Sequence, residues 1–310
     1  MLLFALPEAR HLADPLARAL AIALAPLEDR AFEDGEGKLR PLTSVRGHDV
    51  FVIQSLHSRA DLSVNDRLCR LLFLMGVLRD HGAARITVVT PYLCYSRKDR
   101  RTKPRDPLTL RYVAQLIEAL GCDRIVTLEV HNLMAFQNAF RCQTIHLDMA
   151  TVFEKAVATT LADKPVCVLS PDPGGIKRAQ LFREALEARL DRPVGFAFVD
   201  KRRTAGVQTG GALSGDVAGA RVLIVDDIIA SGGTILAAAR TCHAHQAADC
   251  IAIAAHGLFT SGADALFQSG EVSRILVSDS VPAQQAQIEV VSAVPALATT
   301  IRRLANRSGQ

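Results

Sequence analysis

Short apolar runs alternate with segments of helical periodicity along almost the whole of this 310-residue chain. A parallel strand buried on both faces reads as a continuous run of Val, Ile and Leu, whereas a helix repeats its apolar residues every three or four positions. The alternation therefore predicts an α/β fold with mainly parallel sheets, helices on both faces and right-handed crossovers. The expected strands are 85–93, 124–131, 166–172, 194–200, 221–227, 250–257 and 274–280, and the expected helices are 64–82, 108–121, 179–190 and 233–242.

The length suffices for two domains of ordinary size, each with its own core. Hydrophobic residues make up 49% of the chain and charged residues 22%, which is typical of a globular protein. A complete set of strands and helices ends near 142–150. We therefore expect an N-terminal domain over 1–145 and a C-terminal domain over 146–291. The two halves do not visibly repeat each other's residues, so the sequence alone does not establish a duplication.

The first residues do not read as a targeting or membrane segment. They lack a basic region and meet Pro7, Glu8 and Arg10 too early for a signal peptide. The apolar run that follows carries Asp14 and Arg18, so it is expected to form an amphipathic helix and not a membrane span. The seven cysteines have no paired spacing, as in a cytosolic enzyme with reduced thiols. We expect a cytoplasmic protein that does not bind membranes.

The positive charge is concentrated in two places. The net charge is only +4, but basic residues gather at 97–105 and 201–203. Aromatic residues are 5% of the chain and tryptophan is absent, so no stacking platform for bases accompanies these cations. We therefore expect no nucleic-acid partner. A highly anionic small molecule explains the basic runs, and a solvated basic surface is the alternative.

A sugar-phosphate site is indicated by the segment 220–235, ARVLIVDDIIASGGTI. The apolar strand is expected to stop at Asp226 and Asp227, at the sheet edge where open α/β sheets bind ligands. The small residues 231–234 then form a loop that opens a helix, where backbone N–H groups can hold a phosphate. Two carboxylates would repel a phosphate, so they are expected to accept hydrogen bonds from sugar hydroxyls or to hold a cation. An ordinary strand-to-helix turn is the alternative.

Three further strands are followed by polar or charged residues. Asp172, Gly174 and Gly175 form a second turn that combines an acid with glycines before a helix. Glu129 and His131 follow another strand, and the basic run 97–105 follows a third. Together these segments offer a second phosphate-type loop, cations and magnesium ligands. The alternatives are a plain Pro-Gly turn for the loop and a hydrogen-bonded core side chain for His131.

Taken in order, these pieces resemble one family, the ribose-phosphate diphosphokinases, also called phosphoribosyl pyrophosphate synthetases. The resemblance covers nearly the whole chain. A single motif would be weak evidence, but the ordered set is specific. It comprises FEDGE (32–36), FVIQSL (51–56), PYLCYSRKDRR (91–101), RDPLTLR (105–111), EVH (129–131), SPDPGG (170–175), DKRR (200–203), VDDIIASGGT (225–234), AHGLFTSGA (255–263) and VPALATTIRRL (294–304).

The resemblance implies two similar phosphoribosyltransferase-type α/β domains, an ATP-side domain followed by a domain that binds ribose 5-phosphate. A C-terminal helix at about 292–306 is expected to pack back on the first domain. The implied reaction moves the β,γ-diphosphoryl group of ATP to the C1 hydroxyl of ribose 5-phosphate, giving phosphoribosyl pyrophosphate and AMP. Mg²⁺ is the implied cofactor, inorganic phosphate is a candidate activator, and a homo-oligomer built from dimers is expected.

The resemblance also assigns roles to the residues that match the family's motifs. Asp226 and Asp227 would hold the ribose hydroxyls, and the 5-phosphate would lie in the loop of Ala230, Ser231, Gly232, Gly233 and Thr234. The diphosphate loop would comprise Asp172, Gly174 and Gly175, and magnesium would be supported by His131 and Asp172. ATP would contact Arg97, Lys98, Asp99 and His131, with Phe32, Asp34 and Glu36 contributed by a neighbouring subunit. The catalytic residues would be Lys201 and Arg203, on a flap.

The sequence departs from the family pattern at four places. Lys98 stands where glutamine is usual, Glu129 where aspartate is usual, and Pro173 where histidine is usual; TAGVQTGG follows the flap arginines in place of a segment rich in arginine and proline. These changes bear on the preferred nucleotide and on regulation by phosphate or ADP. Two other functions are the alternatives: a phosphoribosyltransferase, which would not need the first domain, and a non-catalytic sensor that keeps the sugar-phosphate site.

Overall fold

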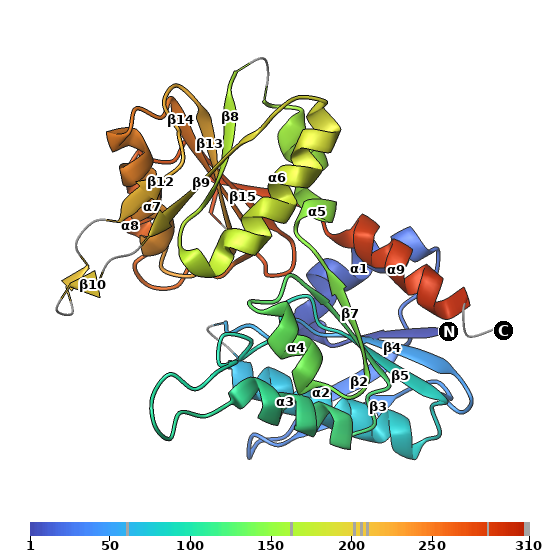
Figure 1. The fold of residues 1–310 in the computed structure, drawn as a ribbon. Helices are drawn as coiled ribbons and strands as arrows, with labels where there is room; N and C mark the ends of the chain where they lie inside the picture. The colour runs from blue at the N-terminus through green and yellow to red at the C-terminus, as the bar shows by residue number, and fades with distance from the viewer. Residues whose placement is uncertain are drawn as a thin grey trace. The chain divides into compact units, whose positions relative to one another are not determined.

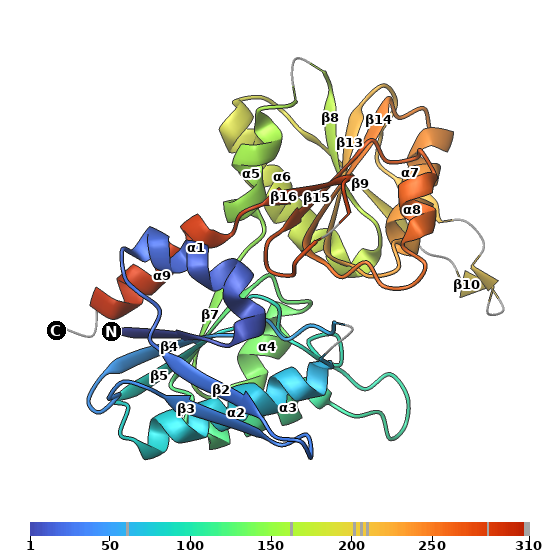
Figure 2. The ribbon, with the colours of Figure 1, turned by 180° about the vertical axis from the view of Figure 1, so that it is seen from behind.

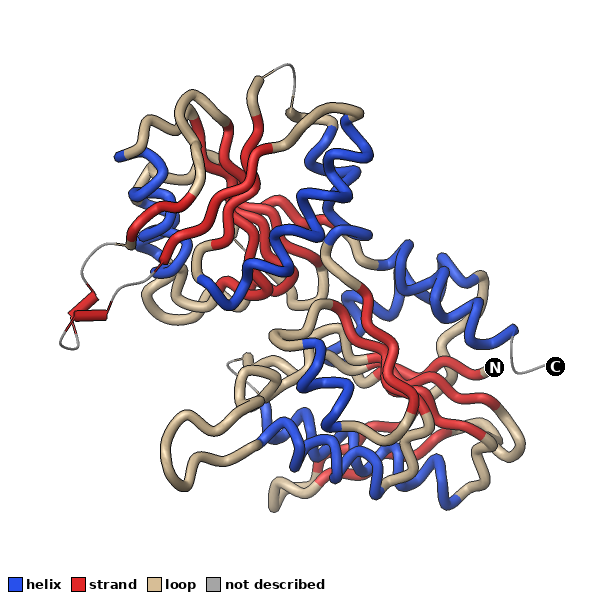
Figure 3. The backbone as a smooth tube through the Cα atoms, viewed as in Figure 1, coloured by secondary structure: helices blue, strands red, loops and turns tan. Residues whose placement is uncertain are grey.

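Two parallel sheets organise the chain, and each belongs to its own unit. The computed structural model describes residues 1–59, 62–161, 164–200, 203–204, 207–208, 211–283 and 285–306. One unit comprises Met1–Leu147 together with Val294–Gln310, and the other comprises Asp148–Ala293. The tube in Figure 3 distinguishes the strands of both sheets from the helices that cover them.

The first unit contains a five-stranded sheet in the order β1-β4-β5-β6-β7, in which all neighbouring strands are parallel. Helices α2, α3 and α4 cover one face, and α1 and α9 lie side by side on the other (Figures 1 and 2). Strands β2 and β3 form a separate antiparallel hairpin beside α2. The elements are β1 (Leu2–Ala5), η1 (Pro7–Ala9), α1 (Arg10–Leu20), β2 (Leu27–Ala31), β3 (Gly37–Pro41), β4 (Asp49–Ile53), α2 (Val64–Asp80), β5 (Arg85–Val89), α3 (Thr109–Ala119), β6 (Arg124–Leu128), α4 (Leu133–Ala139), β7 (Gln143–Leu147) and α9 (Val294–Asn306), where η marks a 3-10 helix.

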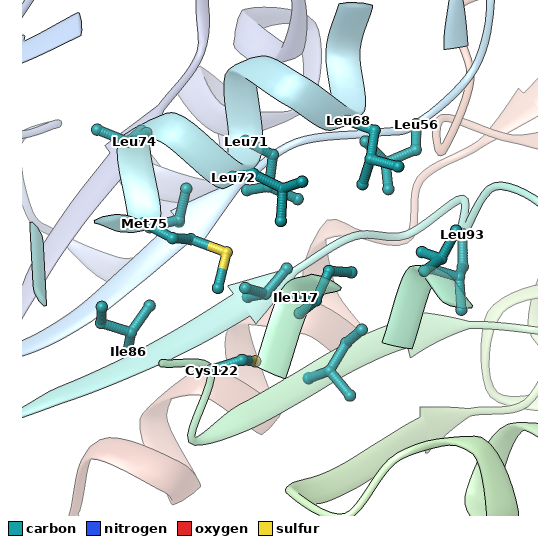
Figure 4. Packing of buried hydrophobic residues seen from close by; sticks show 14 of the residues in the cluster. Leu56, Leu68, Leu71, Leu72, Leu74, Met75, Ile86, Leu93, Ile117 and Cys122 are labelled. Carbon is teal, nitrogen blue, oxygen red and sulfur yellow. The ribbon is translucent and has the colours of Figure 1, made fainter. Parts of the chain in front are cut away.

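The core of this unit lies between the sheet and α2, α3 and α4. Helix α2 begins with a capping box, in which Ser63 Oγ accepts from the Asp66 N–H at 3.2 Å and the Asp66 carboxylate accepts from the Ser63 N–H at 2.9 Å. Its apolar side chains then pack on the strands, as Figure 4 shows for Met75 near Ile86. This packing fixes the carboxyl ends of β4, β5 and β6, from which the loops of the unit emerge.

The last helix of the chain completes the first unit. Leu297, Ile301 and Leu304 of α9 are buried, and the Arg124 guanidinium of β6 donates to the Leu304 carbonyl at 3.2 Å. The Arg302 side chain donates to the Ala19 carbonyl of α1. Residues from the two ends of the sequence therefore share one face of the same sheet.

The second unit contains a seven-stranded sheet in the order β12-β9-β8-β13-β14-β15-β16, parallel except for the β12–β9 pair. Helices α5 and α6 cover one face, and α7 and α8 cover the other (Figures 1 and 2). The elements are α5 (Ala150–Ala158), β8 (Val166–Ser170), η2 (Pro173–Gly175), α6 (Ile176–Leu190), β9 (Gly195–Asp200), β10 (Arg203–Thr204), β11 (Val207–Gln208), β12 (Ala212–Ser214), β13 (Arg221–Ile229), α7 (Gly233–Ala244), β14 (Asp249–Gly257), α8 (Asp264–Gln268), β15 (Arg274–Ser278) and β16 (Ile288–Val291).

The predicted fold class, mainly parallel sheets flanked by helices, is confirmed. One local prediction is wrong: β13 does not stop at Asp226 and Asp227 but continues to Ile229. The reason is its longer neighbour β14, which stays paired up to Gly257, opposite Ile229. Among the helices that the structure describes, none is both long enough and apolar enough to cross a membrane.

Candidate active site

Two adjacent acids lie where β13 extends past the end of its neighbour β8. The last β8–β13 pair joins Leu169 to Ile224, so Asp226 and Asp227 extend beyond the end of β8 at the carboxyl edge of the sheet. The Asp227 N–H donates to Asp226 Oδ1 at 2.8 Å, and Asp227 is only 4% exposed. Burial and the charge of Asp227 raise the pKa of Asp226 well above that of an ordinary carboxyl.

An arginine compensates part of this charge. Arg178 Nη1, from the first turn of α6, lies 3.6 Å from Asp226 Oδ1 and 3.4 Å from Asp227 Oδ1. Its side chain is 11% exposed, so water screens these ion pairs little. Arg178 opposes the rise in the pKa of Asp226. The arrangement holds two carboxylates that can accept hydrogen bonds from neighbouring hydroxyl groups of a ligand.

The loop after β13 presents an open helix end. Helix α7 begins at Gly233, and its N-cap, Gly232, provides no side-chain cap for the first N–H groups. Gly232 has a φ of +76°, and a Cβ there would lie 2.9 Å from Leu266 Cβ, so the local backbone and packing require glycine at this position. Gly233 differs: it is exposed, and the nearest atom to an added Cβ is Ser231 Oγ at 3.8 Å. The bare backbone at Gly233 leaves room for an anion at the N-terminus of α7.

Backbone hydrogen bonds fix this loop from the segment that follows β14. The Thr260 N–H donates to the Ala230 carbonyl at 3.0 Å, and the Leu258 N–H donates to the Ile229 carbonyl at 2.9 Å. Ser231 is exposed and Thr234 is half-buried in the first turn of α7. The predicted residues from Asp226 to Thr234 therefore lie together in one short stretch of the second unit.

The predicted diphosphate loop lies at the end of the adjacent strand β8. Asp172 is the N-cap of η2, and its Oδ1 accepts from the Gly174 N–H at 3.0 Å. Ser170 Oγ donates to the Asp172 carbonyl at 2.7 Å, and a Cβ on Gly175 would lie 2.7 Å from that oxygen atom Oγ. Since β8 and β13 are neighbours and α6 follows the loop directly, the second unit brings the diphosphate loop to the same sheet edge as the acids.

The first unit carries the predicted ATP segment at the carboxyl ends of β5 and β6. Asp99 Oδ2 accepts from Asn132 Nδ2 at 2.9 Å, and Asn132 in turn caps α4. His131, next to Asn132, is exposed, as are Arg97 and Lys98. The hydrogen bond thus ties the basic segment after β5 to the turn that carries His131.

The predicted nucleotide-contacting residues of FEDGE form the tip of the β2–β3 hairpin. The Phe32 N–H donates to the Glu36 carbonyl at 2.8 Å, and Asp34 Oδ1 accepts from the Glu36 N–H at 3.0 Å. Phe32 is 41% exposed, with the Arg30 guanidinium 5.1 Å from the centre of its ring. The hairpin therefore presents an aromatic ring and two carboxylates to the outside of the unit.

Only part of the predicted flap lies within the residues that the structure describes, and the two predicted metal ligands lie in different units. Lys201 lies outside the described residues, and for Arg203 the structure describes the backbone of β10 alone. His131 belongs to the first unit and Asp172 to the second. Within the described ranges, no cluster of three or more His, Cys, Asp or Glu side chains is gathered as for a metal ion.

Comparison with known proteins decides the family. A family model for the N-terminal domain of ribose phosphate pyrophosphokinase matches residues 1–121, and one for the phosphoribosyl transferase domain matches residues 141–281. The ribose-phosphate pyrophosphokinase of Granulibacter bethesdensis is 35% identical over 96% of this chain and 95% of that protein. The chain belongs to the ribose-phosphate pyrophosphokinase family.

Other ribose-phosphate pyrophosphokinases agree over the full length. The one from Ureaplasma parvum is 36% identical over 100% of this chain and 92% of that protein. The crystal structure of phosphoribosylpyrophosphate synthetase from Mycobacterium smegmatis is 31% identical and covers 99% of both chains with a TM-score of 0.89. The resemblance inferred from the motifs is therefore confirmed.

In this member of the ribose-phosphate pyrophosphokinase family, sequence reasoning missed one residue at the edge of the predicted sugar-phosphate site. Arg178 follows the predicted diphosphate loop by only three residues, but no family motif had assigned it a role. A signal was present: a cation in the first turn of a helix opposes the helix dipole and needs a compensating anion. The sequence did not reveal which anion this was.

Proposed function

We propose that the chain transfers the β,γ-diphosphoryl group of ATP to the C1 hydroxyl of ribose 5-phosphate, giving phosphoribosyl pyrophosphate and AMP. The observation that carries the proposal is the pair of acids on β13 followed within a few residues by the open N-terminus of α7. Carboxylates suit the vicinal hydroxyls of a ribose, and the N-terminus of a helix suits its 5-phosphate. Membership of the ribose-phosphate pyrophosphokinase family supports the same reaction.

In the proposed step, the C1 oxygen of the sugar forms a bond to the β-phosphorus of ATP. The bond from that phosphorus to the α,β-bridging oxygen breaks, AMP leaves with this oxygen, and the hydroxyl proton passes to solvent. Such a displacement needs little covalent help from the protein, and its rate depends on positioning and on compensation of charge. Asp226 and Asp227 would orient the sugar, while residues 230–234 would anchor its phosphate.

Of the two residues proposed to support magnesium, Asp172 fits that ion directly and His131 fits it through a bound water. Asp172 is half-buried with one carboxylate oxygen already hydrogen-bonded, and carboxylate is a ligand that Mg²⁺ prefers alongside substrate phosphates. Asp172 and His131 would hold the ion directly or through water. Bound magnesium would neutralise charge on the transferring diphosphoryl group. We assign the diphosphate itself to the loop of Asp172, Gly174 and Gly175.

The remaining assignments concern the nucleotide and the assembly. Arg97, Lys98, Asp99 and His131 would contact ATP, and the exposed hairpin tip with Phe32, Asp34 and Glu36 would reach the nucleotide of a neighbouring subunit. This arrangement requires a homo-oligomer, which we propose is built from dimers. Inorganic phosphate is a proposed activator, and the cytoplasm, where ATP is made available to enzymes, is the proposed location.

The proposed reaction is tested by incubating the purified protein with ribose 5-phosphate, MgCl₂ and ATP and following AMP, with and without added phosphate. AMP that forms only when the sugar is present supports diphosphoryl transfer, and chelation of the metal by EDTA should abolish it. If ribose 5-phosphate binds but no nucleoside triphosphate yields its monophosphate, the proposal fails and the sensor function replaces it.

The proposed flap role of Lys201 has its own test. Lys201→Ala should leave the affinity for ATP nearly unchanged while kcat falls at least about a hundredfold, as when one donor to a developing charge is removed. Lys155→Ala, at an exposed position on α5, is the matched control and should keep full activity. Equal losses of ATP affinity and turnover in Lys201→Ala would argue against a role confined to the transition state.

A further inference from the structure

Arg178 occupies a place where its own helix disfavours it. It is the third residue of α6, so its positive charge lies near the positive end of the helix dipole. Its side chain is also largely buried, at 11% exposed, which removes most of the hydration of the guanidinium. Both costs are offset at one location, because Arg178 Nη1 forms ion pairs with Asp226 and Asp227. The position of the arginine is therefore explained by its ion pairs with the two acids and not by its own helix.

The loop before α6 passes close to the end of β8 and lies next to the guanidinium. A Cβ on Gly175 would lie 2.7 Å from Ser170 Oγ, which is too close, and 3.5 Å from Arg178 Nη1, which is ordinary van der Waals contact. Gly175 is buried and has a φ of −91°, so its backbone conformation alone does not demand glycine. The close approach of neighbouring atoms explains the glycine instead.

Other ionisable groups on the elements around the two acids have other contacts. The Asp172 carboxylate of η2 accepts from the Gly174 N–H. On β14, His256 Nδ1 lies 2.8 Å from Ser280 Oγ. The charged side chains of α7, Arg240 and His243, contact Glu271 near the far end of that helix. Lys177 of α6 is exposed, and Asp249 at the start of β14 pairs with Arg221. Cys167 of β8 and Cys242 of α7 are buried thiols. The later charged residues of α6 are Arg183, Glu184, Glu187 and Arg189.

We propose that Arg178 is a positioning residue for the sugar site: it orients the carboxylates of Asp226 and Asp227 and favours their charged forms before the ribose hydroxyls arrive. The proposal rests on the function proposed above and concerns the same site. Without the arginine, the two buried carboxylates repel each other and retain a proton, so one acceptor becomes a donor and the sugar is gripped less well. Arg178 then acts through the acids, without touching the reacting phosphorus.

The test measures binding of ribose 5-phosphate by titration calorimetry from pH 6.5 to pH 9, in two buffers that differ in ionisation enthalpy. Arg178→Gln should bind the sugar phosphate about tenfold or more weakly near pH 7, as expected when a charged partner is lost, with release of a proton on binding. The deficit should shrink as pH rises and the acids ionise. Wild-type affinity should change much less over this range, and KM for ATP in Arg178→Gln should stay within about twofold of wild type.

Two further variants complete the test. Arg189→Gln removes an arginine of the same helix whose partner is Glu154, at 2.9 Å, and should bind like wild type. Arg178→Lys keeps the charge but not the planar fork, so its binding should be weaker yet nearly independent of pH. If Arg178→Gln shows no cooperative thermal transition, Arg178→Lys carries the test, and a strongly pH-dependent affinity in that variant would overturn the proposal.

The outcomes separate this inference from the proposed function. If wild-type protein binds no ribose 5-phosphate, the proposed function and the role of Arg178 fail together. If wild type binds and Arg178→Gln has the same affinity and pH profile, only the role of Arg178 is overturned. A loss in Arg178→Gln that falls on KM for ATP instead would place the arginine on the nucleotide and also overturn the inference.

Discussion

At the scale of single residues, the proposed sugar site keeps an arrangement that stability alone would not select. Asp226 and Asp227 are adjacent, both are largely buried, and their charges oppose each other beside one arginine. Burial raises the pKa of Asp226, which means that ionising this side chain in the folded protein costs free energy. A ligand that donates hydrogen bonds to both acids would recover part of that cost.

Asp226→Asn should therefore weaken sugar binding and improve stability. Because the folded-state pKa of Asp226 is raised, the carboxyl contributes stability at low pH that is lost as pH rises above the ordinary carboxyl value. The variant should melt higher than wild type at pH 8, and the advantage should disappear towards pH 4. Its affinity for ribose 5-phosphate should fall at least about tenfold, since a hydrogen bond to a charged group is lost. Differential scanning calorimetry across this range, with calorimetric titration of the sugar, measures both; a lower Tm at pH 8 would contradict the first expectation.

His57 provides a second case in which a buried ionisable group sets pH dependence. It is 1% exposed, and burial together with nearby Arg67 lowers its pKa to about 3. Below pH 6.5 the unfolded chain binds a proton that the folded chain does not, so stability falls with pH from that point towards pH 3. Above pH 6.5 this contribution is constant.

His57→Gln should consequently lose less stability on acidification. Between pH 7 and pH 4.5 the difference from wild type should reach about 2–3 kcal/mol, from roughly 1.4 kcal/mol per pH unit. Urea unfolding at a series of pH values gives the free energy of unfolding directly, and the slope against pH is compared, so a constant cost of the substitution does not matter. His48→Gln, at an exposed histidine, is the control. Parallel slopes for wild type and His57→Gln would show that His57 takes no part.

At the scale of elements, two adjacent glycines at the start of α7 separate folding from binding. Gly232→Ala forces a side chain into a φ of +76° and against Leu266, so it should destabilise the protein by about 1–3 kcal/mol. Gly233→Ala meets no atom closer than 3.8 Å and should leave the free energy of unfolding within about 0.5–1 kcal/mol of wild type. The second variant should nevertheless weaken ribose 5-phosphate binding, because the new methyl group occupies the approach to the helix end. Thermal unfolding and calorimetric titration of both variants test the pair; unchanged sugar affinity in Gly233→Ala would remove the anion from this position.

The elements that the sequence predicted well are those whose buried residues form a continuous apolar run or a regular apolar repeat. The strand beginning at Arg221 and the helices α2, α3 and α7 follow directly from apolar periodicity. The end of β13 was misplaced because acids normally mark a strand end, whereas here pairing with β14 sustains the strand. Among the site residues, loops that follow strands could be predicted because parallel strands share one edge. The contact between Arg178 and the two acids could not be predicted, since it depends on where the first turn of α6 lies relative to the end of β13.

At the scale of the whole molecule, the two units differ in how the chain builds them. The second unit, Asp148–Ala293, is one continuous segment, whereas the first needs Val294–Gln310 in addition to Met1–Leu147. Without α9, the buried side chains of Leu297 and Ile301 no longer cover the apolar surface of α1. The two units therefore depend differently on truncation.

A protein consisting of residues 148–293 should unfold cooperatively and bind ribose 5-phosphate, but it should form no AMP. A protein consisting of residues 1–147 should lack a cooperative transition, and adding α9 as a fused segment should restore it. Removing several buried side chains at once costs more free energy than the several kcal/mol by which a domain is normally stable. The fragment 1–147 is therefore expected not to fold. Circular dichroism during heating distinguishes these cases, and a cooperative transition for 1–147 alone would show that α9 is dispensable.

The return of α9 to the first sheet also sets an order for synthesis. A ribosome makes the chain from its N-terminus, so the strands of the first unit leave it early, yet the helix that covers one face of their sheet leaves it only after the second unit. The second unit, although translated later, is complete before that helix emerges. Nascent chains should therefore fold the second unit first, with the apolar side of α1 left for chaperones to cover until α9 emerges.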